Sequence, residues 1–351
     1  MGNSIWIISL GVSFIVCLVS VPLFRQLAIR TDFLDHPADH KQHAKSTPYL
    51  GGAAIFVGIL AAVVVGHDTL HSTIIGIAVA ILFFTGLYDD KKTLRPFAKL
   101  ALQGLAAIIV FVVGFHLEAQ GVWIHLVSSR AIDLVPTFAL FVLMPNCVNL
   151  LDNADGLAGG VVGASTLGIL IESLLRSQFE LAIAAAAVLG ALMAFLIFNR
   201  SPASIFMGDA GSLPLGLVLI VLAVRAGGVL STPEGAAITL MYVAIPLADT
   251  ATVFVARIVN GRSIFQGGQD HLSHRLATSG MSLGVSTWLL IVSQAVISAM
   301  GALGANGTVS IWFSITVAAM VLVSVMAMGI RPSVSRILYQ TTDTVQPVSA
   351  S

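Results

Sequence analysis

The hydrophobic residues of this chain lie in long runs, and short polar segments separate each run from the next. About 20 predominantly apolar residues cross a bilayer as a helix, and a helix satisfies its own backbone hydrogen bonds in lipid. We therefore expect an all-α polytopic membrane protein with about eleven transmembrane helices. The predicted spans are 4–24, 49–66, 71–88, 97–116, 132–151, 157–175, 179–198, 211–225, 236–257, 283–303 and 308–330.

The composition supports this prediction. Hydrophobic residues make up 57% of the 351 residues and charged residues only 10%, against roughly 25% in ordinary soluble domains. The 17 basic residues balance the 17 acidic ones, whereas a nucleic-acid-binding protein usually has a basic excess. We expect a membrane partner and no nucleic-acid partner.

Basic residues are distributed unevenly between the loops on the two sides of the predicted spans. Lys and Arg are enriched in cytoplasmic loops, and here one side holds 14 of the 17. The pattern predicts that the N-terminus lies outside and the C-terminus in the cytoplasm. The cytoplasmic set is Arg25, Arg30, Lys41, Lys45, Lys91, Lys92, Arg95, Lys99, Arg200, Arg257, Arg262, Arg275, Arg331 and Arg336, and the other set is Arg130, Arg176 and Arg225.

The same cytoplasmic side gathers most of the polar chemistry of the chain, including nine aspartates and five of the nine histidines. We therefore expect a cytoplasmic-face active-site cleft. The loops are too short to fold alone, so residues 1–339 are predicted to form a single transmembrane domain and 340–351 a short polar C-terminal tail.

Two cytoplasmic segments carry candidate phosphate or metal chemistry before the middle of the chain. In residues 35–52, Lys41, Lys45 and neighbouring histidines could bind phosphates, although a solvated loop with ordinary positive-inside charge explains them equally well. Adjacent carboxylates at Asp89 and Asp90 repel unless a cation offsets them, which suits a Mg²⁺ site beside a phosphate. The alternative is pairing with the basic residues that follow directly.

Residues 146–160 place several amides and carboxylates directly between two apolar runs. If the preceding helix continues, Asn149, Asp152 and Asp155 lie broadly on one face of it, because their spacing is i, i+3, i+6. Oxygen ligands of this kind suit Mg²⁺ and not zinc. A polar helix cap followed by a glycine-rich turn is the alternative.

Two further polar segments lie later in the chain. Asp209 stands between two glycines before an apolar run, where it could take part in a ligand site, cap a helix, or do both. In residues 260–282, His271, His274 and Arg275 suggest a clamp on a diphosphate, because Arg forks match phosphate oxygens. Solvated loop histidines are the alternative.

Together these segments resemble the polyprenyl-phosphate N-acetylhexosamine-1-phosphate transferase family. The resemblance covers about residues 35–283 and includes the Asp89-Asp90 pair, N-x-x-N-x-x-D-x-x-D-G-L-A from Asn146, and F-N-x-x-P-A-x-I-F-M-G-D-x-G-S from Phe198. It implies Mg²⁺-dependent transfer of an N-acetylhexosamine-1-phosphate from a UDP-amino sugar to undecaprenyl or another polyprenyl phosphate, with release of UMP. Mn²⁺ could replace Mg²⁺, and two copies could form a homodimer.

The resemblance also implies residue roles. Asn149 and Asp209 correspond to Mg²⁺ ligands, and Asp89, Asp90 and Asp209 to catalytic carboxylates. Substrate contacts fall to Lys45 at a phosphate, Phe206 at the uracil ring, Asp152 and Asp155 on the nucleotide side, and also Asn146, His271, His274 and Arg275.

Some questions stay open at this level. Thr93 replaces a third acidic residue common in the family, and the His271-Leu272-Ser273-His274 sequence replaces its usual H-x-H-H. UDP-GlcNAc, for cell-wall or other polysaccharide biosynthesis, is the expected donor, with another UDP-amino sugar or UDP-MurNAc-pentapeptide as alternatives.

A phosphate monoester has a second pKa of about 6, so the acceptor phosphate is already largely dianionic near pH 7 and hardly needs a strong base. We therefore expect Asp89 and Asp90 to position the metal and the acceptor. A lipid or solute transporter is the rival class, with Asp249 as its candidate midplane residue.

Overall fold

Helices form almost all of the chain in the computed structural model, which describes residues 4–35, 46–65, 70–116, 130–228, 233–263 and 268–342. They are α1 (Ile5–Arg30), α2 (Gly51–Val65), α3 (Leu70–Lys91), α4 (Pro96–His116), α5 (Arg130–Leu151), α6 (Leu157–Leu175), α7 (Phe179–Asn199), α8 (Asp209–Gly228), α9 (Pro233–Tyr242), α10 (Ala244–Val259), α11 (Leu272–Thr278), α12 (Leu283–Ala305) and α13 (Ile311–Thr342).

A helix overlaps every predicted span, and α6 has the predicted boundaries. Among the described residues, six helices are long and apolar enough to cross a membrane: α1, α6, α7, α8, α12 and α13. The bent pair α9 and α10 makes a seventh if it counts as one span. These helices indicate a multi-pass membrane protein, and the count of eleven spans stays a prediction.

The predicted span 236–257 is broken, since α9 and α10 meet at an angle of 76°. Pro246, in the first turn of α10, lacks the N–H that would continue the helix backward. Gln294 of α12 bridges the break: its Oε1 accepts the N–H of Ile245 at 3.0 Å, and its Nε2 donates to the carbonyl of Met241 at 2.9 Å. A buried side-chain amide thus replaces one helical hydrogen bond that lipid could not satisfy.

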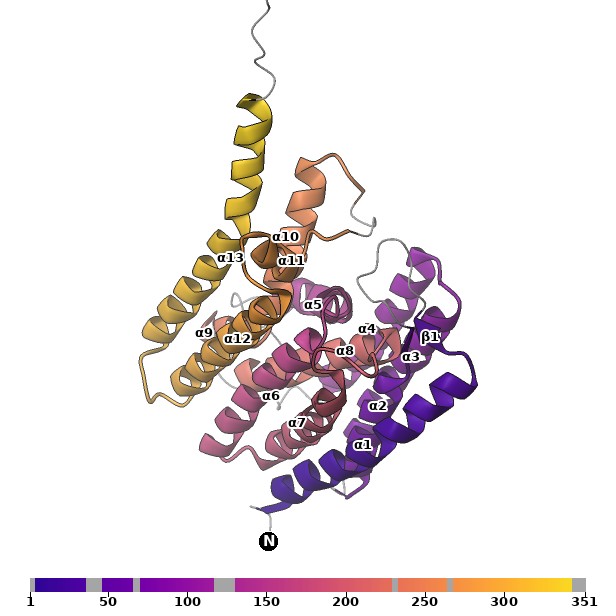
Figure 1. The fold of residues 1–351 in the computed structure, drawn as a ribbon. Coiled ribbons are helices and arrows are strands. Elements are labelled where there is room, and N and C mark those ends of the chain that lie inside the picture. The colour runs from indigo at the N-terminus through magenta and orange to yellow at the C-terminus, as the bar shows by residue number, and fades with distance from the viewer. Residues whose placement is uncertain are drawn as a thin grey trace, which may run out of the picture.

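The central helices are α6, α7 and α8, which are the most buried of the six candidate spans. On one side α1 and α2 pack against α7, and on the other α12 packs against α6 with α13 outside it (Figure 1). The helix α8 also packs against both α3 and α5. The two helices that carry the aspartate pair and the Asn146 motif therefore lie on either side of the helix that begins with Asp209.

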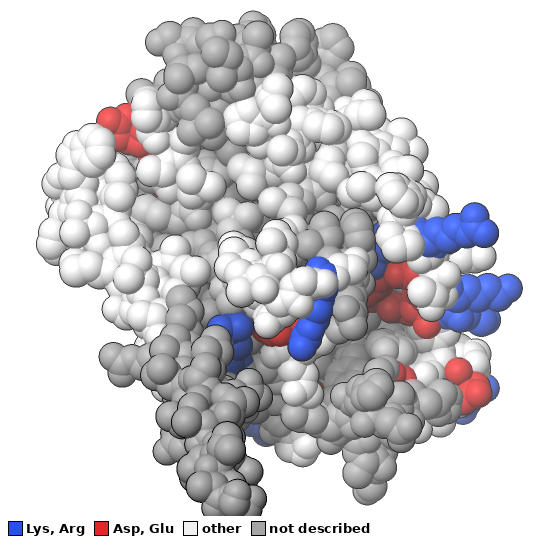
Figure 2. Space-filling view, turned by 90° about the horizontal axis from the view of Figure 1, so that it is seen from above, with Lys and Arg blue, Asp and Glu red and all other residues white. Residues whose placement is uncertain are grey.

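Connecting segments meet at the upper right end of the bundle in Figure 1, near the label β1. Two short strands that the apolar pattern did not predict, β1 (Leu34–Asp35) and β2 (Thr47–Pro48), pair antiparallel there. Phe206 then donates its N–H to the carbonyl of Pro48 at 2.9 Å and accepts the N–H of Gly51 at 2.9 Å. Seen from this end, the charged side chains gather over one part of a largely uncharged face (Figure 2).

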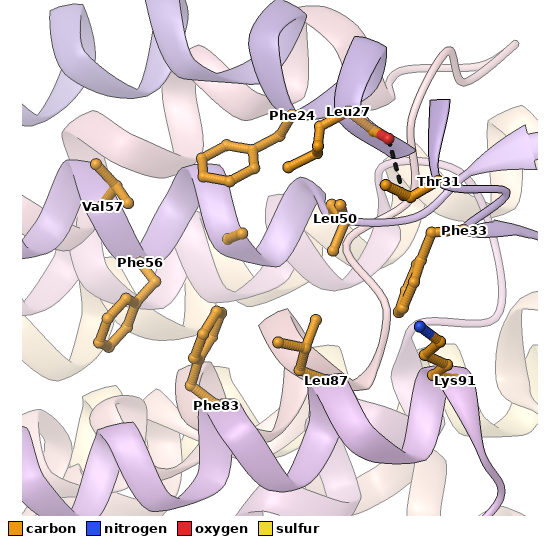
Figure 3. A pocket seen from close by; sticks show the side chains of 11 residues that line it. Phe24, Leu27, Thr31, Phe33, Leu50, Phe56, Val57, Phe83, Leu87 and Lys91 are labelled. Carbon is orange, nitrogen blue, oxygen red and sulfur yellow. Dashed lines mark hydrogen bonds between the residues drawn. The ribbon is translucent and has the colours of Figure 1, made fainter. Parts of the chain in front are cut away.

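A groove opens between α1, α2 and α3 near the same end (Figure 3). Its volume is about 560 Å³, and nine of its eleven lining side chains are aliphatic or aromatic. The two polar exceptions are Thr31 and Lys91.

Candidate active site

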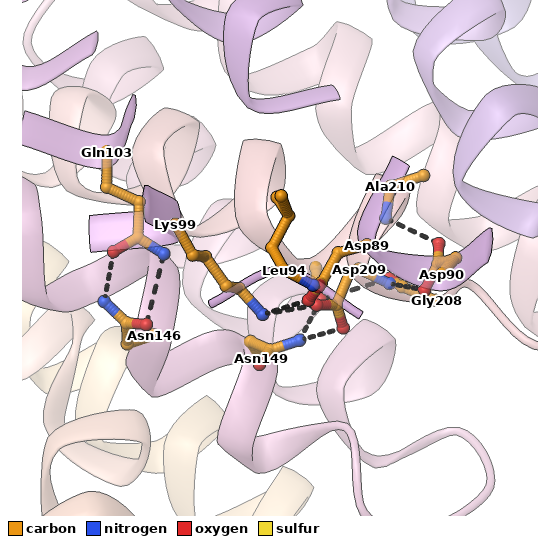
Figure 4. Close-up of polar contacts among 11 residues, drawn as sticks. Asp89, Asp90, Leu94, Lys99, Gln103, Asn146, Asn149, Gly208, Asp209 and Ala210 are labelled. Atoms are coloured by element: carbon orange, nitrogen blue, oxygen red, sulfur yellow. Dashed lines mark hydrogen bonds and ion pairs between the residues drawn. The ribbon is translucent and has the colours of Figure 1, made fainter. Parts of the chain in front are cut away.

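Four helix ends bring residues from distant parts of the sequence into one polar cluster (Figure 4). The end of α3 contributes Asp89 and Asp90, the start of α4 contributes Lys99, the end of α5 contributes Asn149, and the start of α8 contributes Asp209. We call these five residues the carboxylate cluster. Four of them are residues whose types and spacing suggested a Mg²⁺ or phosphate site in the sequence.

Asp90 caps the N-terminus of α8. Its Oδ1 accepts the N–H of Asp209 at 2.8 Å, and its Oδ2 accepts the N–H of Ala210 at 3.0 Å. The first N–H groups of a helix lack intrahelical partners and favour a negative charge. Gly208 permits this approach, because its φ is +65° and a Cβ there would lie 2.6 Å from Asp90 Oδ2. Asp90 therefore fixes the backbone that carries Asp209.

Gly86 allows α3 and α8 to come this close. A Cβ at Gly86 would lie 2.2 Å from the backbone carbonyl oxygen of Asp209. Since that neighbour is backbone and not a flexible side chain, any larger residue at Gly86 would push the two helices apart. The aspartate pair and Asp209 meet because a glycine occupies this position.

Lys99 lies between Asp89 and Asp209. Its Nζ is 3.0 Å from Asp89 Oδ2 and also forms an ion pair with Asp209 Oδ2. The other carboxylate oxygen of Asp89 accepts the N–H of Leu94 at 2.5 Å. In the sequence, the three basic residues directly after the aspartate pair are the candidate partners, and Lys99 is expected only to be a cytoplasmic loop cation. The position of Lys99 in the first turn of the next helix, α4, was the sequence signal that could have indicated its place in the cluster.

Asn149 approaches the same carboxylate from α5. Its Nδ2 donates to Asp209 Oδ1 at 2.5 Å and to the hydroxyl of Ser212 at 3.0 Å. The two predicted Mg²⁺ ligands are therefore neighbours. Among the described residues, no group of three His, Cys, Asp or Glu side chains is arranged to hold a metal ion, so any site here also depends on the Asn149 amide and on the ligand.

The expectation of one helical face across residues 149–155 is wrong, because α5 ends at Leu151. The chain then turns, and Gly156 has the left-handed φ of +76° before α6 begins. Asp155 Oδ2 accepts the N–H of Ala203 at 2.9 Å. This aspartate thus holds the segment before α8 in place, in addition to any contact with a ligand.

Asp152 lies just beyond the end of α5. Burial, and then the nearby carboxylates of Asp209, Asp90 and Asp155, raise the pKa of Asp152 to about 8. A cation bound among these carboxylates would lower that pKa, because it would stabilise the charged form.

Asn146 makes contacts that explain it without a ligand. It exchanges two amide hydrogen bonds with Gln103 of α4, at 2.6 and 3.1 Å, and also donates to the carbonyl of Val142. These bonds join α4 to α5 one turn before Asn149. Gln103 is 1% exposed, and sequence analysis missed it because it lies inside an apolar run.

Phe206 lies in the segment before α8, and its ring centroid is 6.2 Å from that of Tyr49. Its backbone is bonded to the segment before α2, as described above. Lys45, the other predicted substrate contact in this region, lies outside the described residues.

The histidine loop docks on α10 through Asp249. Asp249 is fully buried, and its two carboxylate oxygens contact His271 Nδ1 at 2.8 Å and the N–H of Leu272 at 2.7 Å. Asp249 therefore caps the short helix α11 and fixes the ring of His271. Sequence analysis weighed this aspartate as a midplane transport residue, whereas in the structure it supports the polar loop.

The other two predicted residues of this loop lie in α11. Burial, followed by the neighbouring His271, lowers the pKa of His274. Ser273, between the histidines, donates its hydroxyl hydrogen bond to Asn153 Oδ1 at 2.6 Å, which holds α11 against the 146–160 segment. Arg275 Nε donates to the carbonyl of Gly329 in α13 at 3.1 Å, so part of its guanidinium already holds the helix bundle together.

The cap at Asp90 predicts a measurable effect on stability. Asp90→Ala removes both acceptors at the start of α8, and loss of such a cap costs about 1–2 kcal/mol. We expect a lower thermal midpoint of the purified protein in detergent. Glu180→Ala is the control, since it removes a carboxylate of 82% side-chain exposure that lies outside the carboxylate cluster and accepts no hydrogen bond from α8. Equal midpoints for the two variants would contradict the capping role.

Comparison with known proteins agrees with this geometry. Residues 72–227, which include the whole carboxylate cluster, match the sequence model of glycosyl transferase family 4. A decaprenyl-phosphate N-acetylglucosaminephosphotransferase of Mycobacterium tuberculosis (strain ATCC 25618 / H37Rv) is 31% identical over 310 residues, which cover 77% of this chain and 76% of that protein. The chain belongs to glycosyl transferase family 4.

Two further relatives match along a similar length. A probable undecaprenyl-phosphate N-acetylglucosaminyl 1-phosphate transferase of Bacillus subtilis (strain 168) is 28% identical over 318 residues, 88% of this chain and 87% of that protein. An undecaprenyl-phosphate alpha-N-acetylglucosaminyl 1-phosphate transferase of Escherichia coli (strain K12) is 25% identical over 291 residues, 80% of this chain and 78% of that protein. The resemblance to the polyprenyl-phosphate N-acetylhexosamine-1-phosphate transferases is thus confirmed.

Proposed function

We propose that this protein transfers N-acetylglucosamine-1-phosphate from UDP-N-acetylglucosamine to a polyprenyl phosphate and releases UMP. The single observation that carries the proposal is the convergence of Asp89 and Asp209 on Lys99, with Asn149 beside them, at the ends of apolar helices. Such a site suits a reaction between a soluble phosphate donor and a phosphate that is anchored in the membrane. The names of the relatives reported above support the sugar and the lipid.

The residues present suit Mg²⁺. The ion prefers oxygen ligands and is commonly held by one or two carboxylates together with substrate phosphates. Asp209 and the amide oxygen of Asn149 would hold it, and Asp89 lies on the far side of the same ammonium group. Bound there, Mg²⁺ would supply positive charge for the diphosphate of the donor and for the departing UMP.

The ammonium group of Lys99 occupies the position between Asp89 and Asp209 that the two carboxylates make favourable for a cation. This group pairs with two carboxylates and offsets only one negative charge, and Mg²⁺ would compete with it for Asp209. A displaced Lys99 would still lie near the substrate phosphates and could bind them. Lysine serves well for this purpose because its ammonium group is a compact charge on a flexible stem.

In the proposed reaction, an oxygen of the acceptor phosphate attacks the β-phosphorus of the UDP-sugar. The bond from that phosphorus to the oxygen of the α-phosphate breaks, and UMP leaves with the electron pair. Phosphoryl transfer depends mainly on positioning and charge stabilisation. The contacts of Asp89 and Asp90 support a positioning role, because each of their carboxylate oxygens already accepts a hydrogen bond.

This reasoning predicts the pH dependence of Asp89→Asn. We expect the variant to lose activity at pH 7 and to stay inactive at pH 9, because it lacks a charge and not a proton acceptor. The measurement is UMP release at both values, with wild type as the reference. Recovery of activity at pH 9 would show instead that Asp89 is a general base.

The same proposal places the reaction at the cytoplasmic face of the inner membrane, with the N-terminus outside, as a first membrane step in cell-envelope glycan synthesis. The skewed distribution of Lys and Arg supports this orientation. Labelling of single cysteines introduced at the two chain ends of intact cells and of lysed cells would test it.

The decisive assay mixes purified protein in membranes with polyprenyl phosphate, Mg²⁺ and one labelled UDP-sugar at a time. We expect UMP and a lipid-soluble label with UDP-N-acetylglucosamine. Preference for another UDP-amino sugar, or for UDP-MurNAc-pentapeptide, would correct the donor and keep the reaction class. Release of UDP would refute phosphosugar transfer, and absence of turnover with every donor in folded protein would favour a transporter.

A further inference from the structure

The groove between α1, α2 and α3 has a charged end and an apolar end. Figure 3 shows Lys91 beside Thr31 and Phe33 at one end, and Phe56 with Val57 at the other. The hydroxyl of Thr31, directly after α1, donates a hydrogen bond to the carbonyl of Leu27 at 2.8 Å. Among the described residues that line the groove, Lys91 is the only one with a charged side chain.

The helix α3 sets this polarity. Phe83, Leu87 and Lys91 follow one another at intervals of four residues, which puts them on one face of the helix. At the apolar end, Phe83 stacks on Phe56 of α2 with 4.6 Å between the ring centroids. Along this face the groove thus changes from aromatic to cationic over two helical turns.

Lys91 has no partner of opposite charge within the part of the chain that the structure describes. Its side chain is exposed at the end of α3. An apolar groove with an unpaired cation at one end is complementary to an amphiphile that has an apolar chain and an anionic head. Attraction between a basic side chain near the membrane surface and an anionic lipid is worth about 1 kcal/mol.

The groove faces away from the carboxylate cluster. Lys91 and Asp89 are two positions apart on α3, so their side chains leave opposite sides of the helix. A lipid phosphate at Lys91 would be separated from Lys99 and Asp209 by α3 itself. The acceptor phosphate must reach Asp209, and this groove is therefore unsuited to hold the acceptor.

We propose that this groove binds an anionic phospholipid of the surrounding membrane, with one acyl chain along Phe83 and Leu87 and the phosphate at Lys91. The proposal requires only a membrane setting and does not depend on the reaction proposed above. The bound lipid would also support the site, because Ala210, next to Asp209, belongs to the same apolar cluster as Phe83 and Leu50.

The test compares phosphatidylglycerol with phosphatidylcholine. Purified protein in detergent is titrated with each lipid, and binding is measured by native mass spectrometry and by the shift in thermal midpoint. We expect wild type to prefer phosphatidylglycerol, and Lys91→Gln to lose about five-fold in its affinity for that lipid. Lys92→Gln is the matched control, since Lys92 is exposed next to Lys91 and is absent from the lining.

A second variant tests the chain-binding part of the groove. Val57→Trp adds bulk at the apolar end and should reduce binding of both lipids. Its thermal midpoint without added lipid shows whether it folds, and Lys91→Gln tests the proposal independently if it does not. Equal affinity of wild type for the two lipids, or equal behaviour of Lys91→Gln and Lys92→Gln, would overturn the proposal. Displacement of phosphatidylglycerol by equimolar polyprenyl phosphate would also overturn it and assign the groove to the acceptor.

Discussion

Asp209→Asn is expected to lower kcat by about 10²–10³-fold, a loss comparable to that seen when one preorganised charge-stabilising group is removed from an active site. Asp209 accepts from Asn149 of α5 and pairs with Lys99 of α4, so side chains of two other helices converge on its carboxylate. The amide of the variant keeps the shape of the side chain but has no charge with which to attract Mg²⁺ or Lys99.

UMP release, at saturating substrates and over a range of Mg²⁺ concentrations, measures this effect. We expect the variant to require more Mg²⁺ and to bind Mn²⁺ more weakly in an electron paramagnetic resonance titration, which needs no turnover. The matched control is Glu180→Gln, a carboxylate with 82% of its side chain exposed. A variant with wild-type kcat and Mn²⁺ affinity would remove Asp209 from the proposed metal site.

Lys99→Met is expected to reduce activity by about 10²-fold and, at the same time, to increase the affinity of the ligand-free protein for Mg²⁺. The ammonium group is mostly buried between Asp89 and Asp209, with side-chain exposures of 17%, 13% and 22% for the three residues. Loss of one partner from a buried charge cluster costs about 3–5 kcal/mol because the remaining charge is uncompensated. A divalent cation can then replace the missing positive charge.

Thermal midpoints measured without and with Mg²⁺ separate the loss of stability in Lys99→Met from its gain in affinity for Mg²⁺. Without Mg²⁺ the thermal midpoint of Lys99→Met should fall below that of wild type, and Mg²⁺ should restore more of it than it adds to wild type. Lys99→Arg keeps the charge and should retain both the stability and the ordinary response to Mg²⁺. If Mg²⁺ affects the methionine variant and wild type equally, then Lys99 and the metal do not compete for the same carboxylates.

Some features of the protein were determined by local sequence. The runs of about 20 apolar residues gave the positions of the helices, as at α6 and at α7 (Phe179–Asn199), because a lipid-embedded backbone has no alternative to a helix. Residue types alone also singled out Asp89, Asn149 and Asp209, since hard oxygen ligands are unusual at the ends of apolar helices.

Other features depend on contacts between residues that are far apart in the chain. Asp90 was predicted as a catalytic carboxylate, yet only the meeting of α3 with α8 shows that both its oxygens cap a helix 119 residues away. Helix α10 likewise carries a side chain whose partner lies in a different segment of the chain, since Asp249 contacts His271. The spacing of residues along one helix shows on which face of that helix a side chain lies. It does not show which residue of another helix or loop the side chain contacts.

The sequence by itself thus determined a helical membrane protein with a polar, Mg²⁺-suited motif set, because hydrophobicity and ligand chemistry are properties of single residues and their near neighbours. The tertiary structure decided which of these residues share one cluster, which ones cap or brace it, and that Lys99 belongs among them. Those assignments depend on glycines such as Gly86 that let two helices approach closely, and on ion pairs formed across the bundle. Such long-range contacts leave no periodic signal in the sequence.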